Sequence, residues 1–324
     1  MNNDAGLSPG RWPGGKRCAV AVTVDFNDIH GILSQVPAVA GREKTLSVWR
    51  YGTLRGIDRL LALLAAKNVP ASWCVPGVVA EEHPDRIRQI RQGGHELAGR
   101  GYRFESFDAL TLAEQIKSVR RGNAAIANIT GAAPRGFRLP AGNWADGLPD
   151  ALVAEGLCWT SGWRGDDLPF FIPLHSPADA VPAPRLVELP LHYELEDEPY
   201  FAFNLSPAVP PAQSRIASYS QTLGNMKMDF DGFYRFGLCY VLRLHPEVIG
   251  TAGRIGVLGE LLDYIAAHPD VWVATAGDIA DWWRRSQPDN DPAHPAEVWR
   301  RHRGRENPAG PFPTGELPKR MPHD

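Results

Sequence analysis

Apolar and polar residues recur along this chain with two alternating periods. Short runs rich in β-branched and aromatic residues, such as 17–26 (RCAVAVTVDF) and 236–246 (FGLCYVLRLHP), predict buried strands. Between such runs, apolar residues spaced three or four positions apart predict helices, as in 54–68, where Leu60 and Leu64 fall on one face. This alternation predicts a parallel sheet with helices outside it, and the chain length favours a closed or nearly closed barrel.

Capping and turn residues set the expected boundaries of these elements. Thr111 and Glu114 form the signature of a capping box, and Gly131 ends the helix that they begin. The other expected strands are 69–77, 95–99, 134–140, 156–162, 187–193 and 271–278, and the other expected helices are 83–94, 148–155, 253–269 and 278–285.

The two ends of the chain lack these patterns. Residues 1–16 are polar and rich in glycine and proline, and residues 286–324 turn to Pro, Arg and Asp without apolar periodicity. We therefore expect one barrel domain over 17–285, an N-terminal extension before it, and a flexible, irregular C-terminal tail after it. The Pro-rich segment 194–215 is expected to be irregular as well, as a lid or a subunit contact.

Composition narrows the class of protein. The 324 residues are 44% hydrophobic and 22% charged, with a net charge of -3, which gives no electrostatic reason to expect nucleic acid or a membrane surface as partner. The N-terminal residues lack the apolar run of a secretory signal. The four cysteines are widely spaced and are expected to be buried free thiols in a reducing cytoplasm.

Polar residues cluster where the expected strands end. In a barrel of parallel strands these carboxyl ends converge on one side, which we call the mouth, and such folds carry their chemistry there. The candidates for the mouth are Asp25, Asn27, Asp28, His95, Glu96, Arg100, Phe104, Arg138, Trp144, Asp166, Asp167, His192 and His245.

Several fragments, in this order and spacing, resemble the polysaccharide deacetylase (NodB-homology) superfamily. They are RWPGGKRCAVAVTVDF, HPDRIRQIRQGGHELAGRGYRF, TGAAPRGFRLP, DDLP, LPLHYELEDEP and LHPEVIGTAGRIGVL, and the similarity runs over roughly residues 11–285. The sequence is most similar to the cytoplasmic branch with the metal-independent allantoinase and the peptidoglycan deacetylase-like cyclic imidases. The resemblance implies a distorted (β/α)7 barrel, hydrolysis of amide-like C–N bonds, a small-molecule substrate and a homo-oligomer.

The resemblance also locates a metal site and shows that its ligands are replaced. Metal-using relatives imply a base at Asp25, a metal-binding Asp at position 27 and two histidines at positions 100 and 104. Here those three ligands are Asn27, Arg100 and Phe104. Neutral Asn is a weak ligand, Arg is permanently charged and Phe coordinates nothing, so we expect no family-type metal and no cofactor.

Other candidate ligands are less favoured. His95 precedes the family ligand positions, and a packing histidine is the preferred interpretation. Asp25, Asp28 and His30 offer another cation cluster in principle, although acids at a loop are usually solvated turn residues.

The remaining roles follow from the resemblance. It implies that His245 is the general acid that protonates the leaving nitrogen and that Arg138 orients Asp25. Arg100 would take the place of the metal charge and bind a substrate carboxylate or a developing oxyanion. The other expected substrate-binding residues are Asn27, Asp28, Phe104, Trp144, His192 and Asp167.

Three functions stay open from the sequence. The first is a metal-independent hydrolase of a small amide, cyclic imide or ureide. The second is a binding protein, in which Arg100 pairs with Asp25 and lowers the pKa of the base. The third is an isomerase or cyclase that uses acid–base pairs in the same mouth.

Overall fold

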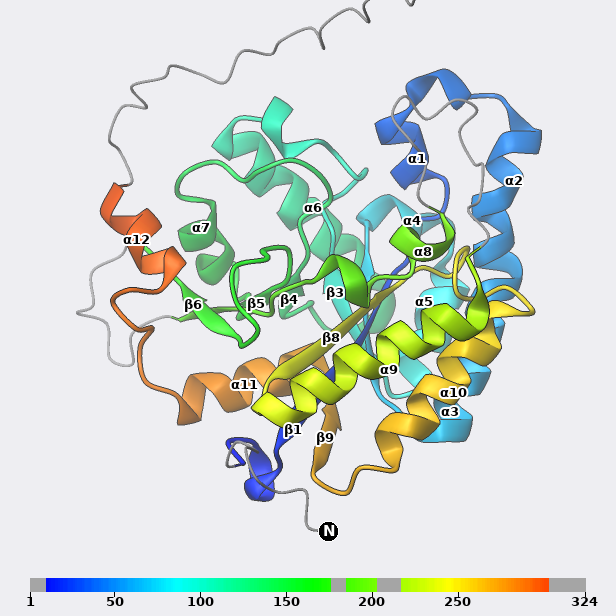
Figure 1. Cartoon of the computed structure of the whole chain (residues 1–324). Helices are drawn as coiled ribbons and strands as arrows, with labels where there is room; N and C mark the ends of the chain where they lie inside the picture. The colour runs from blue at the N-terminus through cyan, green and yellow to red at the C-terminus, as the bar shows by residue number, and fades with distance from the viewer. Residues whose placement is uncertain (1–9, 176–184, 203–216, 303–324) are drawn as a thin grey trace, which may run out of the picture.

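The sheet is the centre of the molecule (Figure 1). The structure is a computed structural model that describes residues 10–175, 185–202 and 217–302. Within these residues one nine-stranded sheet forms. The strands are β1 (Cys18–Asp25), β2 (Ala71–Val75), β3 (Glu96–Gly99), β4 (Gly136–Phe137), β5 (Trp159–Thr160), β6 (Phe170–Ile172), β7 (Leu186–Glu188), β8 (Cys239–Leu244) and β9 (Val271–Ala274).

Seven strands run parallel in the order β7-β5-β4-β3-β2-β1-β8. β6 pairs antiparallel with β7, and β9 pairs in parallel with the first half of β1. Beyond β7 the chain reaches β8 through a single bridge between Glu196 and Arg243, so the sheet curls into a nearly closed barrel. This architecture confirms the predicted (β/α)7 barrel.

Helices surround the barrel. They are α1 (His30–Gln35), α2 (Glu43–Tyr51), α3 (Ile57–Lys67), α4 (Gly77–Glu82), α5 (Pro84–Gln92), α6 (Leu112–Thr130), α7 (Leu148–Ala154), α8 (Glu198–Phe201), α9 (Tyr219–Phe236), α10 (Arg254–Ala266), α11 (Ala276–Ser286) and α12 (Pro295–His302). No helix among the described residues is long and apolar enough to cross a membrane.

Alternation along β1 separates an outer from an inner core. Val20, Val22 and Val24 face the helix layer, where they join side chains of α3, α9 and α10. Ala19 and Ala21 face the barrel interior and meet other small side chains there. This small apolar layer fills the interior below the mouth and leaves the next positions on the same inner face for polar side chains.

Most expected elements form close to their predicted positions. The capping box of α6 is present, because the Thr111 side chain accepts from the backbone of Glu114 and Glu114 returns the hydrogen bond. α9, with eighteen residues, and α2 were not predicted. Of the segment 194–215, residues 203–215 lie outside the described residues, and α8 lies in the described part.

The expectation of an irregular tail is wrong for residues 295–302, which form α12. Ala296 is buried, and the Trp299 ring packs edge-on against Trp163 at 5.4 Å. The His294 ring hydrogen-bonds Asp166 at 3.0 Å. A helix of eight residues with so few apolar positions shows no periodicity, which is why the pattern missed it. Residues 1–9 and 303–324 of the expected extension and tail lie outside the described residues.

Candidate active site

The side chains of the mouth come from the carboxyl ends of the strands. They follow the inward-facing residues of each strand at a spacing of two positions. On β8, Val241 faces the interior, and Arg243 and then His245 follow it on the same side. Asp25 ends β1 on the inner face, and Arg100 follows the inner Ala98 of β3. Strand alternation thus places several charged side chains side by side above an apolar interior.

Asp25 is the centre of this group and is completely buried. Its Oδ1 accepts from Arg138 Nη1 at 2.7 Å, and its Oδ2 accepts from Arg243 Nε at 2.8 Å. Arg100 Nη1 lies 3.1 Å from the same Oδ2. Burial alone would raise the pKa of Asp25, but the charges of Arg100, Arg138 and Arg243 outweigh it and hold the pKa well below the usual range. Asp25 is therefore ionised and a weak proton acceptor.

Two of the three arginines are well hydrogen-bonded. Arg138 donates to Thr23 Oγ1 at 3.0 Å and to the Ser161 hydroxyl and carbonyl at 2.8 and 3.2 Å. Arg243 also donates to Glu196 Oε2 at 2.9 Å. These contacts fix both guanidinium planes around the carboxylate of Asp25.

Arg100 differs from both. It is 1% exposed, and its one hydrogen bond, from Nη2 to the Pro140 carbonyl, is long at 3.5 Å. Its Nε and Nη1 find no hydrogen-bond acceptor among the described residues. The Phe104 ring covers the guanidinium at 4.8 Å. Burial lowers the pKa of Arg100 to about 10 despite the opposing charge of Asp25, so it stays cationic at neutral pH with donors left over.

His245 is oriented by Asp197. Its Nδ1 lies 2.7 Å from Asp197 Oδ1, and its backbone N–H donates to Asp197 Oδ2 at 2.8 Å. The Nε2 then points between two carboxylates, with Asp25 Oδ2 and Glu198 Oε2 each at 3.8 Å. Burial would lower the pKa of His245, but Glu198 and Asp197 raise it to about 10. At neutral pH the ring carries both protons and can donate from Nε2.

Glycine backbones hold the loop that follows His245. A Cβ on Gly56 would lie 2.1 Å from the Pro246 carbonyl oxygen, and one on Gly52 would lie 2.5 Å from the Glu247 nitrogen. Both glycines belong to a π-helical turn, Gly52–Gly56, between α2 and α3. This contact requires glycine and places the His245 loop directly against the helix layer.

The residues at the family metal positions do not fit a divalent cation. Arg100 supplies a fixed positive charge, which repels a metal ion at contact distance in a buried site. Phe104 is buried against it at φ 59°. Asn27 is also buried, and its Oδ1 has no hydrogen-bond partner within the described part of the chain.

A cavity of about 310 Å³ lies beside Arg138. It is lined by Leu139, Gly142, Asn143, Trp144, Thr160, Ser161, Gly162, Trp163 and Arg164. Ser161 links the cavity to the charged group through Arg138. The Trp144 and Trp163 rings contact each other at 5.6 Å and provide an apolar wall, and a substrate-binding role of Trp144 stays a prediction.

Glu188 lies buried behind this wall. Its carboxylate accepts from the Thr160 hydroxyl and from the backbone N–H groups of Gly162 and Trp163, the latter at 2.8 Å. Burial raises the pKa of Glu188 to about 7 in spite of these hydrogen bonds. No pattern in the sequence indicated this residue, which holds the loop that lines the cavity.

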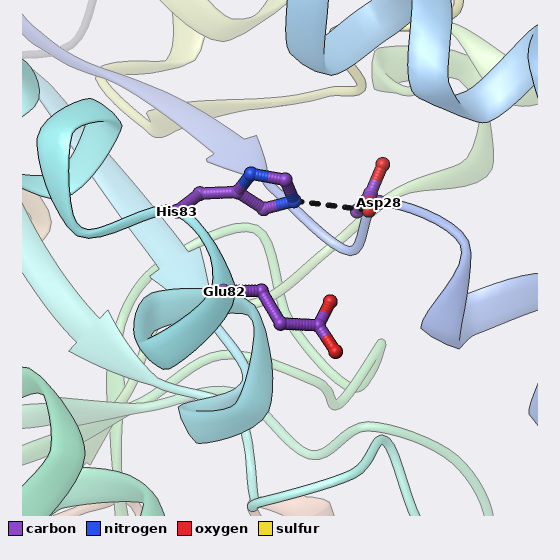
Figure 2. Close-up of side chains that lie close together, drawn as sticks. All are labelled: Asp28, Glu82 and His83. Atoms are coloured by element: carbon purple, nitrogen blue, oxygen red, sulfur yellow. Dashed lines mark hydrogen bonds and ion pairs between the residues drawn. The ribbon is translucent and has the colours of Figure 1, made fainter.

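Asp28 turns away from the mouth (Figure 2). Its Oδ1 accepts from Thr53 at 2.7 Å and its Oδ2 lies 3.1 Å from His83 Nε2. Glu82 approaches the same place but pairs with His30 at 2.9 Å. Ligand atoms of Asp28, Glu82 and His83 all lie within 4.8 Å of one another, so this is where a cation could be held outside the mouth. The suggested combination of Asp25 with Asp28 and His30 does not form.

His192 and Asp167 are also remote from Asp25. Their side chains pair with each other at 3.3 Å, and His192 packs on Phe233 of α9. The Asp167 carbonyl accepts from Cys239, the first residue of β8, whereas His245 follows the last. Six residues of extended strand span about 20 Å. The expectation that both line the mouth is not met, because the loop after β5 folds down along β8 rather than over its carboxyl end.

Two further candidates have structural roles. His95 is buried, accepts from the Ala71 backbone N–H at its Nδ1 at 3.2 Å and packs on Trp73, as expected for a packing histidine. Asp166 accepts from the backbone N–H groups of Asp167 and Leu168 and so braces its own loop.

The sequence missed Arg243, Glu196, Asp197 and Glu198. A signal for Arg243 existed, since it is the one charged residue in the apolar run of β8 and stands two positions before His245. The acids of ELEDEP gave no comparable signal, because an acidic stretch near prolines usually marks a solvated loop.

Comparisons with known proteins show which family this chain resembles. The sequence profile of the family described as polysaccharide deacetylase matches residues 49–157. A solved structure named as a polysaccharide deacetylase from Mycobacterium smegmatis is 32% identical, with 88% of this chain and 98% of that chain covered and a TM-score of 0.78. The peptidoglycan deacetylase of Helicobacter pylori is 24% identical over 296 residues, which cover 84% of this chain and 98% of the relative.

The allantoinase PuuE shares the fold, with a TM-score of 0.70 at 22% identity over 88% of this chain and 96% of that chain. This chain belongs to the polysaccharide deacetylase family. It is a hydrolase of the deacetylase type that acts on C–N bonds.

Proposed function

We propose that this protein hydrolyses a C–N bond of a small amide, cyclic imide or ureide without a metal ion. The observation that carries the proposal is Arg100, a buried guanidinium at the position where relatives imply a metal ligand, which lies 3.1 Å from Asp25 but whose Nε and Nη1 make no hydrogen bond among the described residues. A carbonyl oxygen of the substrate would complete these contacts, and the contacts would strengthen as negative charge develops on that oxygen.

His245 is the proposed acid. Asp197 fixes its ring, and Nε2 carries the proton that the leaving nitrogen needs. Asp25 occupies the position of the family base, but three arginines hold its charge. We therefore assign Asp25 to a different task, which is to keep the guanidinium groups of Arg100, Arg138 and Arg243 together.

The cavity supports a small substrate. Its volume of about 310 Å³ lies at the lower end of the range for small-molecule sites. The Trp144 and Trp163 rings offer a flat apolar surface to a planar ring, and Asn143 and Ser161 offer polar contacts at its edge. The similarity in fold to an allantoinase is consistent with a cyclic ureide or imide.

The test combines metal analysis with an activity panel. Purified protein is expected to hold substoichiometric zinc and to turn over at least one substrate among imides, hydantoins, allantoin, small amides and N-acetyl sugars in the presence of a chelator. In ¹⁸O-water, hydrolysis places solvent oxygen in a new carboxylate, whereas isomerisation does not.

A triple variant serves as the matched control. Asn27→Asp, Arg100→His and Phe104→His together restore the three metal-ligand types and should give one bound zinc per chain. Stoichiometric zinc in the unmodified protein, or activity that a chelator abolishes, would contradict metal independence.

A further inference from the structure

The proposed chemistry leaves one task without a residue, which is removal of a proton from the attacking water. Asp25 is a poor acceptor because both of its oxygens contact arginines, Oδ1 with Arg138 and Oδ2 with Arg243 and Arg100. His245 already carries its protons and is needed as the acid. The Asp197 carboxylate is buried and accepts from the His245 backbone and the Ile249 backbone as well as from the His245 ring.

Among the described residues, one carboxylate beside His245 contacts neither an arginine nor a backbone N–H group. Glu198 begins α8, and 47% of its side chain is exposed, whereas Asp25 and Asp197 are completely buried. Its Oε2 lies 3.8 Å from His245 Nε2. Glu198 therefore borders both solvent, from which the water must come, and the nitrogen that carries the acidic proton.

We infer that Glu198 is the general base of this enzyme, which is the role that the family resemblance implies for Asp25. The inference rests on the proposed hydrolase function. It takes its support from the two sides of His245: arginines contact the carboxylate on the inner side, whereas the carboxylate on the outer side has no arginine within ion-pair distance among the described residues.

The reaction balances with these groups. Glu198 takes one proton from water while the water oxygen forms a bond to the carbonyl carbon, and the C=O electron pair moves onto the oxygen that faces Arg100. When the tetrahedral intermediate collapses, the C–N bond breaks, and the nitrogen keeps the electron pair and takes the proton of His245 Nε2. Glu198 then returns its proton to His245, so one water is added across the C–N bond and the enzyme is restored.

The pairing also explains the protonation of His245. The charge of Glu198 raises the pKa of this histidine, as do the charge and the hydrogen bond of Asp197. A charged Glu198 thus keeps the acid protonated before reaction, and neutralisation of Glu198 in the water-attack step makes His245 a stronger acid when the leaving nitrogen needs the proton.

The test is Glu198→Gln, with Glu194→Gln as matched control. Glu194 is an exposed carboxylate of the same segment that faces His192 rather than His245. With a substrate found in the activity panel, we expect Glu198→Gln to lower kcat roughly 10²- to 10⁴-fold with a small change in KM. Glu194→Gln should keep full activity, and equal thermal midpoints of all three proteins would exclude unfolding as the cause.

A second variant separates proton transfer from a charge effect on His245. In Glu198→Ala, added formate, acetate and propionate should restore turnover, and the restored rate should rise with the basicity of the added carboxylate. Full activity of Glu198→Gln, or a Glu198→Ala variant that no carboxylate rescues, would overturn the assignment while wild-type activity stands. A wild type inactive on the whole panel would overturn the proposed function and this assignment with it.

Discussion

Asp25 and Asp28 stand three residues apart at the end of β1, yet they form opposite kinds of site. Asp25 faces the barrel interior, where Arg100, Arg138 and Arg243 surround it. Asp28 has φ 45° and faces the helix layer, where it contacts Thr53 and His83. The change of side comes from the end of regular strand geometry after Asp25, so short spacing in sequence does not mean a shared site.

The two sites also differ in how completely their polar groups are hydrogen-bonded. Each oxygen of Asp28 has a hydrogen-bond partner, Thr53 for Oδ1 and His83 for Oδ2. Around Asp25, Nε and Nη1 of Arg100 make no hydrogen bond within the described part of the chain, although Nη1 lies 3.1 Å from the carboxylate. A buried guanidinium in that state costs stability unless a ligand completes it, which is typical of a binding or catalytic site rather than a structural one.

Neutralising each aspartate should give the largest difference. Asp25→Asn leaves three arginines without their shared carboxylate, and removing one partner of a buried ion pair costs about 3–5 kcal/mol. Asp28→Asn keeps its shape and loses only hydrogen bonds to a charged group, at about 1.5–3 kcal/mol. Urea unfolding of both variants measures this. Equal losses would show that the arginines do not depend on Asp25.

Replacing Arg100 should separate activity from stability. Arg100→Met removes the donors proposed for the developing oxyanion, so kcat should fall about 10²- to 10³-fold. The free energy of unfolding should stay the same or rise, because a poorly hydrogen-bonded buried charge gives way to an apolar chain. Arg138→Met is the control. It should destabilise the protein, since Arg138 has four hydrogen-bond acceptors. A comparable loss of stability in both variants would refute the distinction.

Alkaline pH should weaken the mouth but not the Asp28 site. The pKa of His245 is raised in the folded state to about 10, so its stabilising contribution is complete below the unfolded value of about 6.5 and disappears as pH rises through 10. The free energy of unfolding should therefore fall between pH 7 and 10 more steeply in wild type than in His245→Gln. Parallel pH profiles would mean that the ring is not held as a cation.

The smallest effect is expected at the edge of the Asp28 site. His83→Gln removes one hydrogen bond to Asp28 from a side chain that is partly exposed, and should cost about 1 kcal/mol without changing turnover. Chemical denaturation and the substrate assay check the two halves of this prediction. A loss of activity would connect the Asp28 site with the chemistry.

The barrel could be predicted because strands and helices of this fold have strong patterns. The run 17–26 and the capping residues of α6 identify their elements without help from the rest of the chain. α12 could not be found, because its stability comes from the contacts of Ala296 and Trp299 with residues more than a hundred positions away. Helix α9 was missed although its buried residues Met226, Phe230 and Phe233 recur three or four positions apart, which is the spacing of a helix.

The group around Asp25 could be predicted where a residue keeps a family residue, as at Arg138 and His245, or replaces one, as at Arg100. Arg100 and Phe104 stand out because the resemblance implies histidines at these positions. In the structure Arg100 contacts Asp25, and the Phe104 ring packs against Arg100. Glu198 could be found only from the structure, because its proposed role depends on its contact with His245, which lies 47 residues further along the chain. Asp28 shows the opposite case, in which proximity in sequence suggested a role that strand geometry does not support.

The central position of β1 has a consequence for how the chain is made. β1, which begins at Cys18, pairs with β8 and β9, whose residues 239–274 follow it much later in the chain. During translation the edge of β1 that pairs with β8 and β9 therefore stays unpaired until these later strands have been synthesised. Such distant pairing slows folding and exposes an apolar edge to aggregation, so this protein should depend on chaperones while it is still on the ribosome.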